Sequence, residues 1–188
     1  KRKFRERVMK TLKGKKINLR PLEPEDLQFL YDSENDESNW KVSGTQVPYS
    51  KFILKNYIKN SHQDIYEAKQ ARLVIEDKKT KIPVGMIDLF DFDPLHRKSG
   101  IGILVLDQYQ KNGFASEAIE LIISYAFHYL NLHQLYANIT TDNTGSVRLF
   151  EKFKFQLIGI KKDWIYHNQK FYDESTYQLI HAIKGDHE

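Results

Sequence analysis

Residues 101–130, IGILVLDQYQKNGFASEAIELIISYAFHYL, contain the change of hydrophobic period that decides the fold. The run IGILVL at 101–106 is apolar throughout, which is typical of a buried strand. From Gly113 onward the apolar residues recur at helical spacing and form one stripe along a helix over 113–130. The turn at 110–115 therefore joins a buried strand to a helix N-terminus. Free N–H groups and the helix dipole favour an anion such as phosphate at such a turn.

Short apolar or alternating runs predict strands around this unit, over 17–22, 72–76, 84–92, 101–106, 135–139, 157–161, 164–166 and 177–180. Helices are predicted to open at Pro24, after the capping residue Ser50, and over 144–152. The strands between 72 and 106 follow one another as antiparallel neighbours, and the strand–helix–strand crossover from 101 to 139 adds a parallel pair. The predicted fold is a single α/β domain, with a mixed, mostly antiparallel sheet and helices on both faces.

Length and composition exclude several classes of protein. With 188 residues, 40% of them hydrophobic, the chain is long enough for one compact domain with a core. It has no cysteine, which excludes disulfide scaffolds, thiolate metal sites and cysteine nucleophiles, and no metal site is expected. No run is long and apolar enough for a membrane span, and the start does not resemble a signal peptide, so we expect a cytoplasmic protein without membrane partners.

Positive charge is concentrated at the start of the chain. Residues 1–16 hold nine lysines and arginines against one acid, and the whole chain carries a net charge of +4, so residues 17–188 carry −4. We expect residues 1–16 to be a flexible basic leader and residues 17–188 to form the domain. A basic arm suits nucleic acid or an anionic surface, but a solvated leader is the simpler interpretation, and no nucleic-acid partner is expected.

The turn QKNGFA at 110–115 resembles the pyrophosphate loop of the GNAT family of N-acetyltransferases, Arg/Gln-x-x-Gly-x-Gly/Ala. Downstream, NTGSVRLFEKFKF at 143–155 resembles the family's segment Asn-x-x-(Ser/Ala)-x-x-x-Tyr-x-Lys-x-Gly-Phe, and residues 18–27 resemble its opening strand and helix. The resemblance runs in order from about residue 17 to 180 and is nearest to the spermidine/diamine and ribosomal-protein acetyltransferase branches. It implies direct transfer of an acetyl group from acetyl-CoA, as co-substrate, to a primary amine within a ternary complex.

The resemblance also implies which residues hold acetyl-CoA. The pantetheine arm would pair with the backbone of Ile103, Leu104 and Val105, and the pyrophosphate would lie on the amides of the turn. Asn143 would bond the pantetheine region, although an asparagine before a helix is also a common cap. The expected cofactor-binding residues are Ile103, Leu104, Val105, Gln110, Lys111, Asn112, Gly113, Phe114, Ala115, Asn143 and Phe150.

Two positions depart from the family pattern. Phe150 stands where the family has a tyrosine that is often taken as the general acid, and Lys154 stands where it has glycine. A phenylalanine can pack beside the cofactor but cannot donate a proton. A thiol ionises near pH 8.5, so the thiolate of CoA can leave without obligatory protonation. Catalysis therefore does not require a tyrosine at this position, but the identity of any acid stays open.

The incoming amine is an ammonium and must lose a proton to a carboxylate or histidine. Asp91 is the leading candidate because it interrupts an apolar run, and Asp93 and His96 follow it. In a regular strand Asp88 and Asp91 face opposite sides, whereas Asp91 and Asp93 share one. The alternative, that these acids project into solvent from a sheet edge, is left open.

The acceptor is predicted from charge. The acidic body and the stretch Asp32-x-Glu34-x-Asp36-Glu37 favour a polyamine, with Trp40, Tyr49 and Asp88 as expected substrate-binding residues. One alternative is acetylation of a peptide amine at a protein N-terminus, and another is a sensor that binds acyl-CoA without catalysis. A homodimer is also left open.

Overall fold

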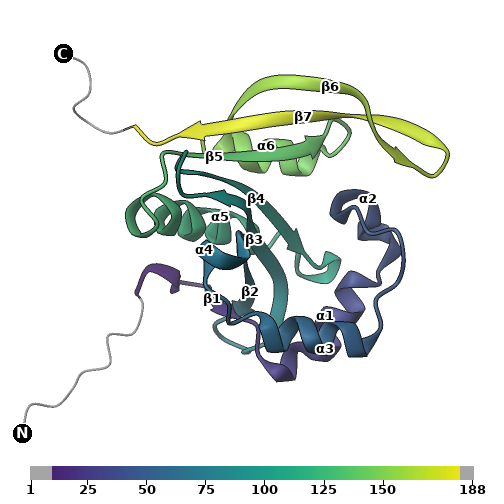
Figure 1. Cartoon of the computed structure of the whole chain (residues 1–188), viewed down its shortest axis with the longest axis vertical. Coiled ribbons are helices and arrows are strands. Elements are labelled where there is room, and N and C mark those ends of the chain that lie inside the picture. The colour runs from purple at the N-terminus through teal and green to yellow at the C-terminus, as the bar shows by residue number, and fades with distance from the viewer. Residues whose placement is uncertain (1–9, 183–188) are drawn as a thin grey trace, which may run out of the picture.

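The computed structural model describes residues 10–182. One seven-stranded sheet has the order β1-β2-β3-β4-β5-β7-β6 (Figure 1). Its strands are β1 (Ile17–Pro21), β2 (Ala71–Asp77), β3 (Pro83–Asp93), β4 (Lys98–Val105), β5 (Gln134–Thr140), β6 (Gln156–His167) and β7 (Lys170–Ile180). The helices are α1 (Leu27–Glu34), α2 (Trp40–Ser43), α3 (Lys51–Asn60), α4 (Ile65–Ala68), α5 (Phe114–Ser124) and α6 (Thr144–Lys152). The pair β4–β5 is parallel and the other pairs are antiparallel, which confirms the predicted mixed sheet.

Alternation along the strands sends apolar side chains to both faces of the sheet. On one face Val74 and Met86 pack with Leu30 of α1 and Leu54 of α3. The other face is covered by α5 and α6, and its larger cluster includes Ile75, Ile87, Leu89, Ile119, Ile122 and Phe150. The predicted placement of helices on both faces is therefore confirmed.

The helix predicted over 113–130 is not regular to its end. α5 ends at Ser124, and Tyr125–Tyr129 continues as a π-helical turn, closed by the Leu130 N–H donating to the Tyr125 carbonyl at 3.0 Å. The rings of Tyr125 and Tyr129 stack in this turn with centroids 5.2 Å apart. The apolar stripe predicts the buried face correctly as far as Ala126, but Tyr129, which the same spacing includes, is exposed. The spacing does not distinguish a five-residue turn from an α-helical one.

Residues 10–16 belong to the folded body, which corrects the boundary drawn at residue 17. Lys10–Leu12 forms a 3₁₀ turn, and Leu12 is buried in the same core cluster as α5. Lys13 forms a β-bridge with Asn18, and the Gly14 N–H donates to the Ile17 carbonyl at 2.8 Å. A buried leucine holds the segment in place despite its basic composition. The rest of the predicted leader lies outside the described residues.

The C-terminal strands are longer than the apolar runs that predicted them. The runs predicted at 157–161 and 164–166 are parts of one strand, β6, which is irregular between Lys161 and Ile165. β7 begins at Lys170, seven residues before its predicted start. Together they form a hairpin ribbon that extends beyond the rest of the sheet toward α2 (Figure 1). Most of β6 is exposed on both faces. A strand prediction depends on the alternation of apolar and polar residues that one buried face imposes, and β6 has no such face along most of its length.

Candidate active site

A slot opens in the sheet where β4 and β5 separate. The two strands pair only over residues 98–100 against 134–136, and beyond these positions their backbones have no common ladder. The diverging segments line one cavity of about 640 Å³, with residues 101–104 on one wall and 137–140 on the other. Backbone N–H and C=O groups at such an edge are free to pair with an extended ligand. Ile103 and Leu104 lie in this wall, whereas Val105 lies in the core beside the slot. Their pairing with the pantetheine arm stays a prediction.

A cluster of charged side chains lies in the same cavity, on the face covered by α1 and α3. Arg72 of β2 donates to Asp88 of β3 through two bonds of 2.8 and 2.9 Å, and it also pairs with Glu34 at the end of α1 at 2.5 Å. Burial lowers the pKa of Arg72, but the charges of Asp88 and Glu34 outweigh it, so the guanidinium pKa is raised. The two carboxylates exceed the one guanidinium and leave the cluster with a net negative charge.

Hydroxyl groups complete this part of the cavity. Tyr57 of α3 lies with its ring 5.7 Å from the Arg72 guanidinium, and burial raises the pKa of its phenol, which stays protonated at neutral pH. The Ser33 hydroxyl is buried in the cavity wall and finds no hydrogen-bond partner within residues 10–182. A buried polar group without a partner costs free energy, so this hydroxyl is suited to bond a polar ligand.

At the rim of the cavity, side-chain contacts connect α2 with the other half of the sheet. Lys41 pairs with Asp142, before α6, at 2.6 Å, and its ammonium lies 4.3 Å from the centre of the Tyr172 ring on β7. Tyr49 lines the cavity, and its contact with the substrate stays a prediction. Trp40 is not among the lining residues, because its indole N–H donates to the Glu34 carbonyl at 2.9 Å and fixes α2 to the end of α1. Its predicted substrate contact is therefore corrected to a packing role.

The turn at 110–115 contains two left-handed residues and leads directly into α5. Gly113 precedes α5 with φ of 82°, and Lys111 also has a positive φ of 62°. The Gln110 side chain donates to the Val105 carbonyl at 3.2 Å, and Asn112 donates to the Tyr109 carbonyl at 3.1 Å. The side chains thus stabilise the turn internally, and the first N–H groups of α5 have no partner within the helix. Phe114 and Ala115 begin α5 and pack against the core.

The two residues predicted from the downstream segment both line the cavity. Asn143 caps α6, because its side-chain oxygen accepts from the Ser146 N–H at 3.1 Å, and it faces the cavity as well. Phe150 is buried, with its ring at the cavity wall and edge-to-face against Phe155 at 5.0 Å. The cap and the ligand-contact interpretations of Asn143 are therefore compatible. The residues of the slot, of the turn at 110–115 and of this segment fit acetyl-CoA.

Asp91, Asp93 and His96 are not among the residues that line the cavity. Asp91 has φ of 48° where the register of β3 and β4 shifts, which breaks the alternation assumed for a regular strand. Its carboxylate accepts from the Tyr136 hydroxyl at 3.1 Å, and burial, with the Asp91 charge, raises the pKa of Tyr136 to about 12. Asp93 accepts from the His96 N–H at 2.9 Å and closes the turn to β4.

Sequence patterns did not indicate Arg72 or Tyr57, and they marked Glu34 only as part of an acidic stretch. Arg72 lies opposite Asp88 in the β2–β3 register. The hairpin over 72–92 was predictable, but a register shift between Ile75 and Glu76 moves every pairing beyond it. The pair of Arg72 and Asp88 therefore becomes apparent only once the position of this bulge is known.

Residues 16–156 match the acetyltransferase (GNAT) domain family. The match covers more than half of the chain, and the chain belongs to this family. The protein is therefore an N-acetyltransferase that takes the acetyl group from acetyl-CoA and transfers it to a primary amine. Within residues 10–182 no helix is long and apolar enough to cross a membrane, and no three acidic or histidine side chains are grouped to hold a metal ion.

Individual relatives of the chain have names that are more specific than the name of the family. The chain is 28% identical over 166 residues to the spermidine N(1)-acetyltransferase of Vibrio cholerae serotype O1, covering 88% of this chain and 94% of that protein. The crystal structure of the Vibrio cholerae spermidine N-acetyltransferase with CoA and spermine superposes with a TM-score of 0.80 at 25% identity, covering 88% and 95% of the two chains. A dodecameric structure of the Vibrio cholerae enzyme superposes with a TM-score of 0.74 at 28% identity, covering 88% and 94%.

Proposed function

We propose that the protein acetylates a primary amine of a polyamine. The observation that carries this proposal is the pair of carboxylates, Glu34 and Asp88, held together by Arg72 in the cavity that the β4–β5 slot enters. A polyamine is a flexible chain with several ammonium groups, and a net negative cluster in a partly buried cavity attracts it. The Vibrio cholerae relatives, which act on spermidine, support the same substrate class.

Cofactor binding and acceptor binding fall to separate groups of residues. On the slot wall, the backbone of Ile103 and Leu104 would align the pantetheine arm, while the turn at 110–115 would hold the pyrophosphate. On the opposite wall, Glu34 and Asp88 would accept hydrogen bonds from the substrate ammonium groups and orient one amine. Acetyl-CoA supplies the thioester on which that amine acts.

The proton balance follows from the chemistry of the acceptor. The substrate ammonium loses one proton to water before its nitrogen forms the bond to the acetyl carbon. The bond from that carbon to sulfur then breaks, and the nitrogen loses a second proton, which the departing thiolate or water takes up. An ammonium with a reference pKa of about 10.4 is harder to prepare at neutral pH than a thiolate of about 8.5 is to release. Phe150 supplies no acid for the departing thiolate, but because the amine is the harder group to prepare, we expect its deprotonation to limit the rate.

Steady-state kinetics with a panel of amines tests this proposal. We expect kcat/KM for spermidine to exceed that for n-butylamine at least tenfold and to fall with added salt, because ion pairing drives acceptor binding. A short peptide with a free N-terminus represents the alternative acceptor. Preference for the peptide, or equal rates for spermidine and butylamine without salt dependence, would contradict the polyamine proposal. Acetyl-CoA binding without turnover on any amine would instead identify a sensor.

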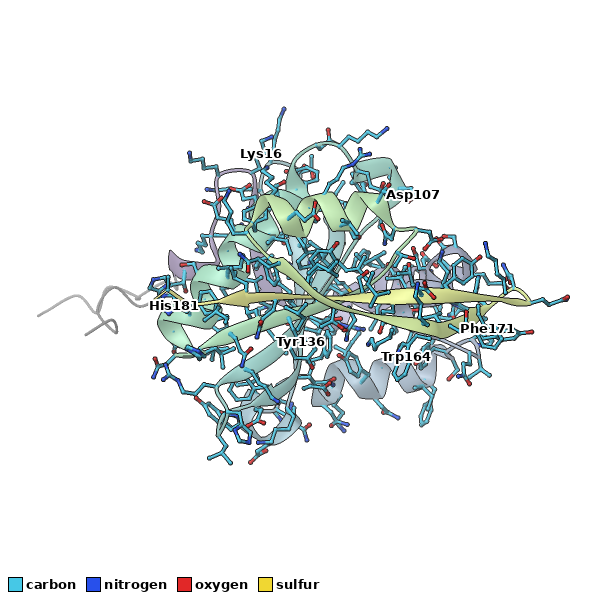
Figure 2. All side chains as sticks on the ribbon, turned by 90° about the horizontal axis from the view of Figure 1, so that it is seen from above. Lys16, Asp107, Tyr136, Trp164, Phe171 and His181 are labelled. Atoms are coloured by element: carbon cyan, nitrogen blue, oxygen red, sulfur yellow. The ribbon has the colours of Figure 1, made fainter. Side chains whose placement is uncertain are left out.

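Self-association stays a prediction, and the edge strand β6 supports it. Ile158, Ile160, Trp164 and Tyr166 of β6 and Phe171 of β7 are exposed. Figure 2 labels Trp164 and Phe171 near the far end of the β6–β7 ribbon. Exposed apolar side chains along a strand edge favour contact with another chain, and one of the Vibrio cholerae structures is a dodecamer. Light scattering on the purified protein will give the number of copies, and a monomer at micromolar concentration would exclude this prediction.

A further inference from the structure

The segment that precedes β1 lies directly against the start of α5. The Glu117 carboxylate, in the first turn of α5, accepts hydrogen bonds from the backbone N–H groups of Lys15 and Lys16, the latter at 2.9 Å. Gly14 permits this approach, since a Cβ there would lie 2.7 Å from the Glu117 carboxyl carbon. Bonds from N–H groups to a carboxylate are stronger than neutral ones. The segment and the helix are therefore joined at the point where the helix begins.

Lys16 extends this connection to the turn itself. Its ammonium donates to the Asn112 carbonyl at 3.0 Å, and a Cβ placed on Gly113 would lie 3.3 Å from the same nitrogen. Lys111 and Gly113, which flank Asn112, are the two left-handed residues of the turn. A left-handed conformation at a non-glycine residue is strained and persists where neighbouring contacts impose it. The Lys16 contact lies between these two residues and restrains the carbonyl that joins them.

The same segment is fixed from the other side by the β2–β3 turn. The Lys78 N–H donates to the Lys16 carbonyl at 2.8 Å, and the Lys78 ammonium donates to the Gly14 carbonyl at 3.1 Å. Lys16 lies on the same side of the β6–β7 ribbon as Asp107, in the turn after β4 (Figure 2). Residues 14–16 are therefore held between two rigid elements, and the position of Lys16 does not depend on its own flexible side chain alone.

We propose that residues 10–16 are a positioning element of the cofactor site, in which Glu117 and Lys16 hold the turn at 110–115 in the shape that receives the pyrophosphate of acetyl-CoA. The inference rests on the proposed assignment of that turn to the cofactor. Leu12 anchors the segment in the core, Glu117 sets its distance from α5, and Lys16 restrains the Asn112 carbonyl. The basic segment thus acts on cofactor affinity and not on the amine acceptor.

Two physical explanations of such an effect predict opposite changes in CoA affinity when Glu117 is replaced. If charge alone matters, Glu117→Ala removes a negative charge near the pyrophosphate and tightens CoA binding. If the residue positions the turn, the same change frees the segment and weakens binding. Glu120→Ala is the matched control, because Glu120 is exposed on the same helix and carries the same charge.

The experiment measures the Kd of CoA by calorimetry with the full chain. We expect Kd to rise at least tenfold in Glu117→Ala and in Lys16→Met, less than threefold in Glu120→Ala, and to recover most of its wild-type value in Lys16→Arg. The kcat at saturating acetyl-CoA and the KM for spermidine should stay within about twofold, because the segment does not reach the acceptor cavity. Hydrogen exchange of the amides at 111–115 should become faster in both weakened variants.

The outcomes separate the two proposals. Wild-type protein that does not bind CoA would overturn the cofactor site and the proposed function together. Wild-type protein that binds CoA, with Glu117→Ala binding equally well or more tightly, would overturn the positioning role alone. Gly14→Ala keeps the test decisive if Glu117→Ala fails to fold, since the added methyl group displaces the Glu117 carboxylate without removing its charge.

Discussion

Arg72 and Asp88 lie opposite each other on β2 and β3, and the guanidinium holds the carboxylate through two parallel bonds of 2.8 and 2.9 Å. The same guanidinium bonds Glu34 from α1, so a sheet residue fixes two carboxylates from separate elements on one side of the cavity. Fixed carboxylates bind an ammonium without first losing side-chain entropy. This arrangement supplies the acceptor side of the proposed reaction.

Asp88→Asn should lower kcat/KM for spermidine at least tenfold and leave the Kd of CoA within about twofold. The substitution keeps the shape but removes one of the charges that attract the substrate. Asp91→Asn is the control, because Asp91 is exposed and outside the cavity, and it should retain nearly full activity. A large loss of activity in Asp91→Asn with none in Asp88→Asn would return the base to the position first predicted from the sequence.

Gly113→Val should weaken CoA binding at least tenfold. With φ of 82°, this position disfavours any β-branched residue, and the new side chain would press on the Lys16 ammonium and alter the turn. Gly159→Val is the control, since a Cβ at Gly159 meets nothing within 4 Å. Calorimetry on both variants, with circular dichroism to show folding, makes the comparison. Equal affinity in folded Gly113→Val and wild-type protein would exclude this turn as the pyrophosphate site.

Phe150→Tyr should raise kcat by less than about tenfold, although general acid catalysis is typically worth 10²- to 10⁴-fold. The new hydroxyl would be placed at the cavity wall, but we expect deprotonation of the amine, not thiolate departure, to limit turnover. Measurement of kcat from pH 6 to 9 distinguishes these steps. A gain of a hundredfold or more would show that departure of the thiolate limits the wild-type enzyme.

Leu12→Ala should lower the free energy of unfolding by about 2–5 kcal/mol, the range for truncating a buried leucine. Leu12 is 8% exposed and packs in the cluster that includes α5. Leu95→Ala is the matched control, because Leu95 is 82% exposed and its truncation should cost less than about 0.5 kcal/mol. Urea unfolding of both variants gives the difference. Similar stability in the two would show that residues 10–16 do not belong to the cooperative fold.

Asp26 should make stability depend on acidic pH. Burial raises the pKa of its carboxyl, but the bonds from Arg20 at 2.7 and 2.9 Å and from the Glu23 N–H at 2.8 Å outweigh burial, so its pKa is lowered from the usual value of an aspartate. A depressed pKa contributes stability above the unfolded-state value and loses it as the pH falls through the folded value. Unfolding free energies should therefore drop less between about pH 5 and 3 in Asp26→Asn than in wild type. An unchanged drop, with Asp32→Asn as the exposed control, would exclude this contribution.

The local pattern of the sequence by itself determined much of the fold. The switch of period at Gly113 predicts the β4–α5 crossover, because the strand and helix repeats are properties of short segments. Ser50 caps α3 as predicted, accepting from the Ile53 N–H at 3.2 Å. The departure at Phe150 is likewise visible in the sequence, since it needs only the spacing from Asn143.

Contacts between distant segments decided the rest. Glu34, Arg72 and Asp88 meet in one cavity because the β2–β3 register, with its bulge, places Arg72 opposite Asp88 and the end of α1 brings Glu34 to the same guanidinium. A left-handed residue at Asp91 breaks the strand alternation assumed for Asp88, Asp91 and Asp93, and one buried leucine at position 12 makes a basic segment part of the domain. Sequence periodicity reports which side of an element is apolar, whereas pairing register and backbone handedness arise when elements pack. The turn at 110–115 was therefore apparent from the chain, and the cavity that contains Glu34, Arg72 and Asp88 only from the fold.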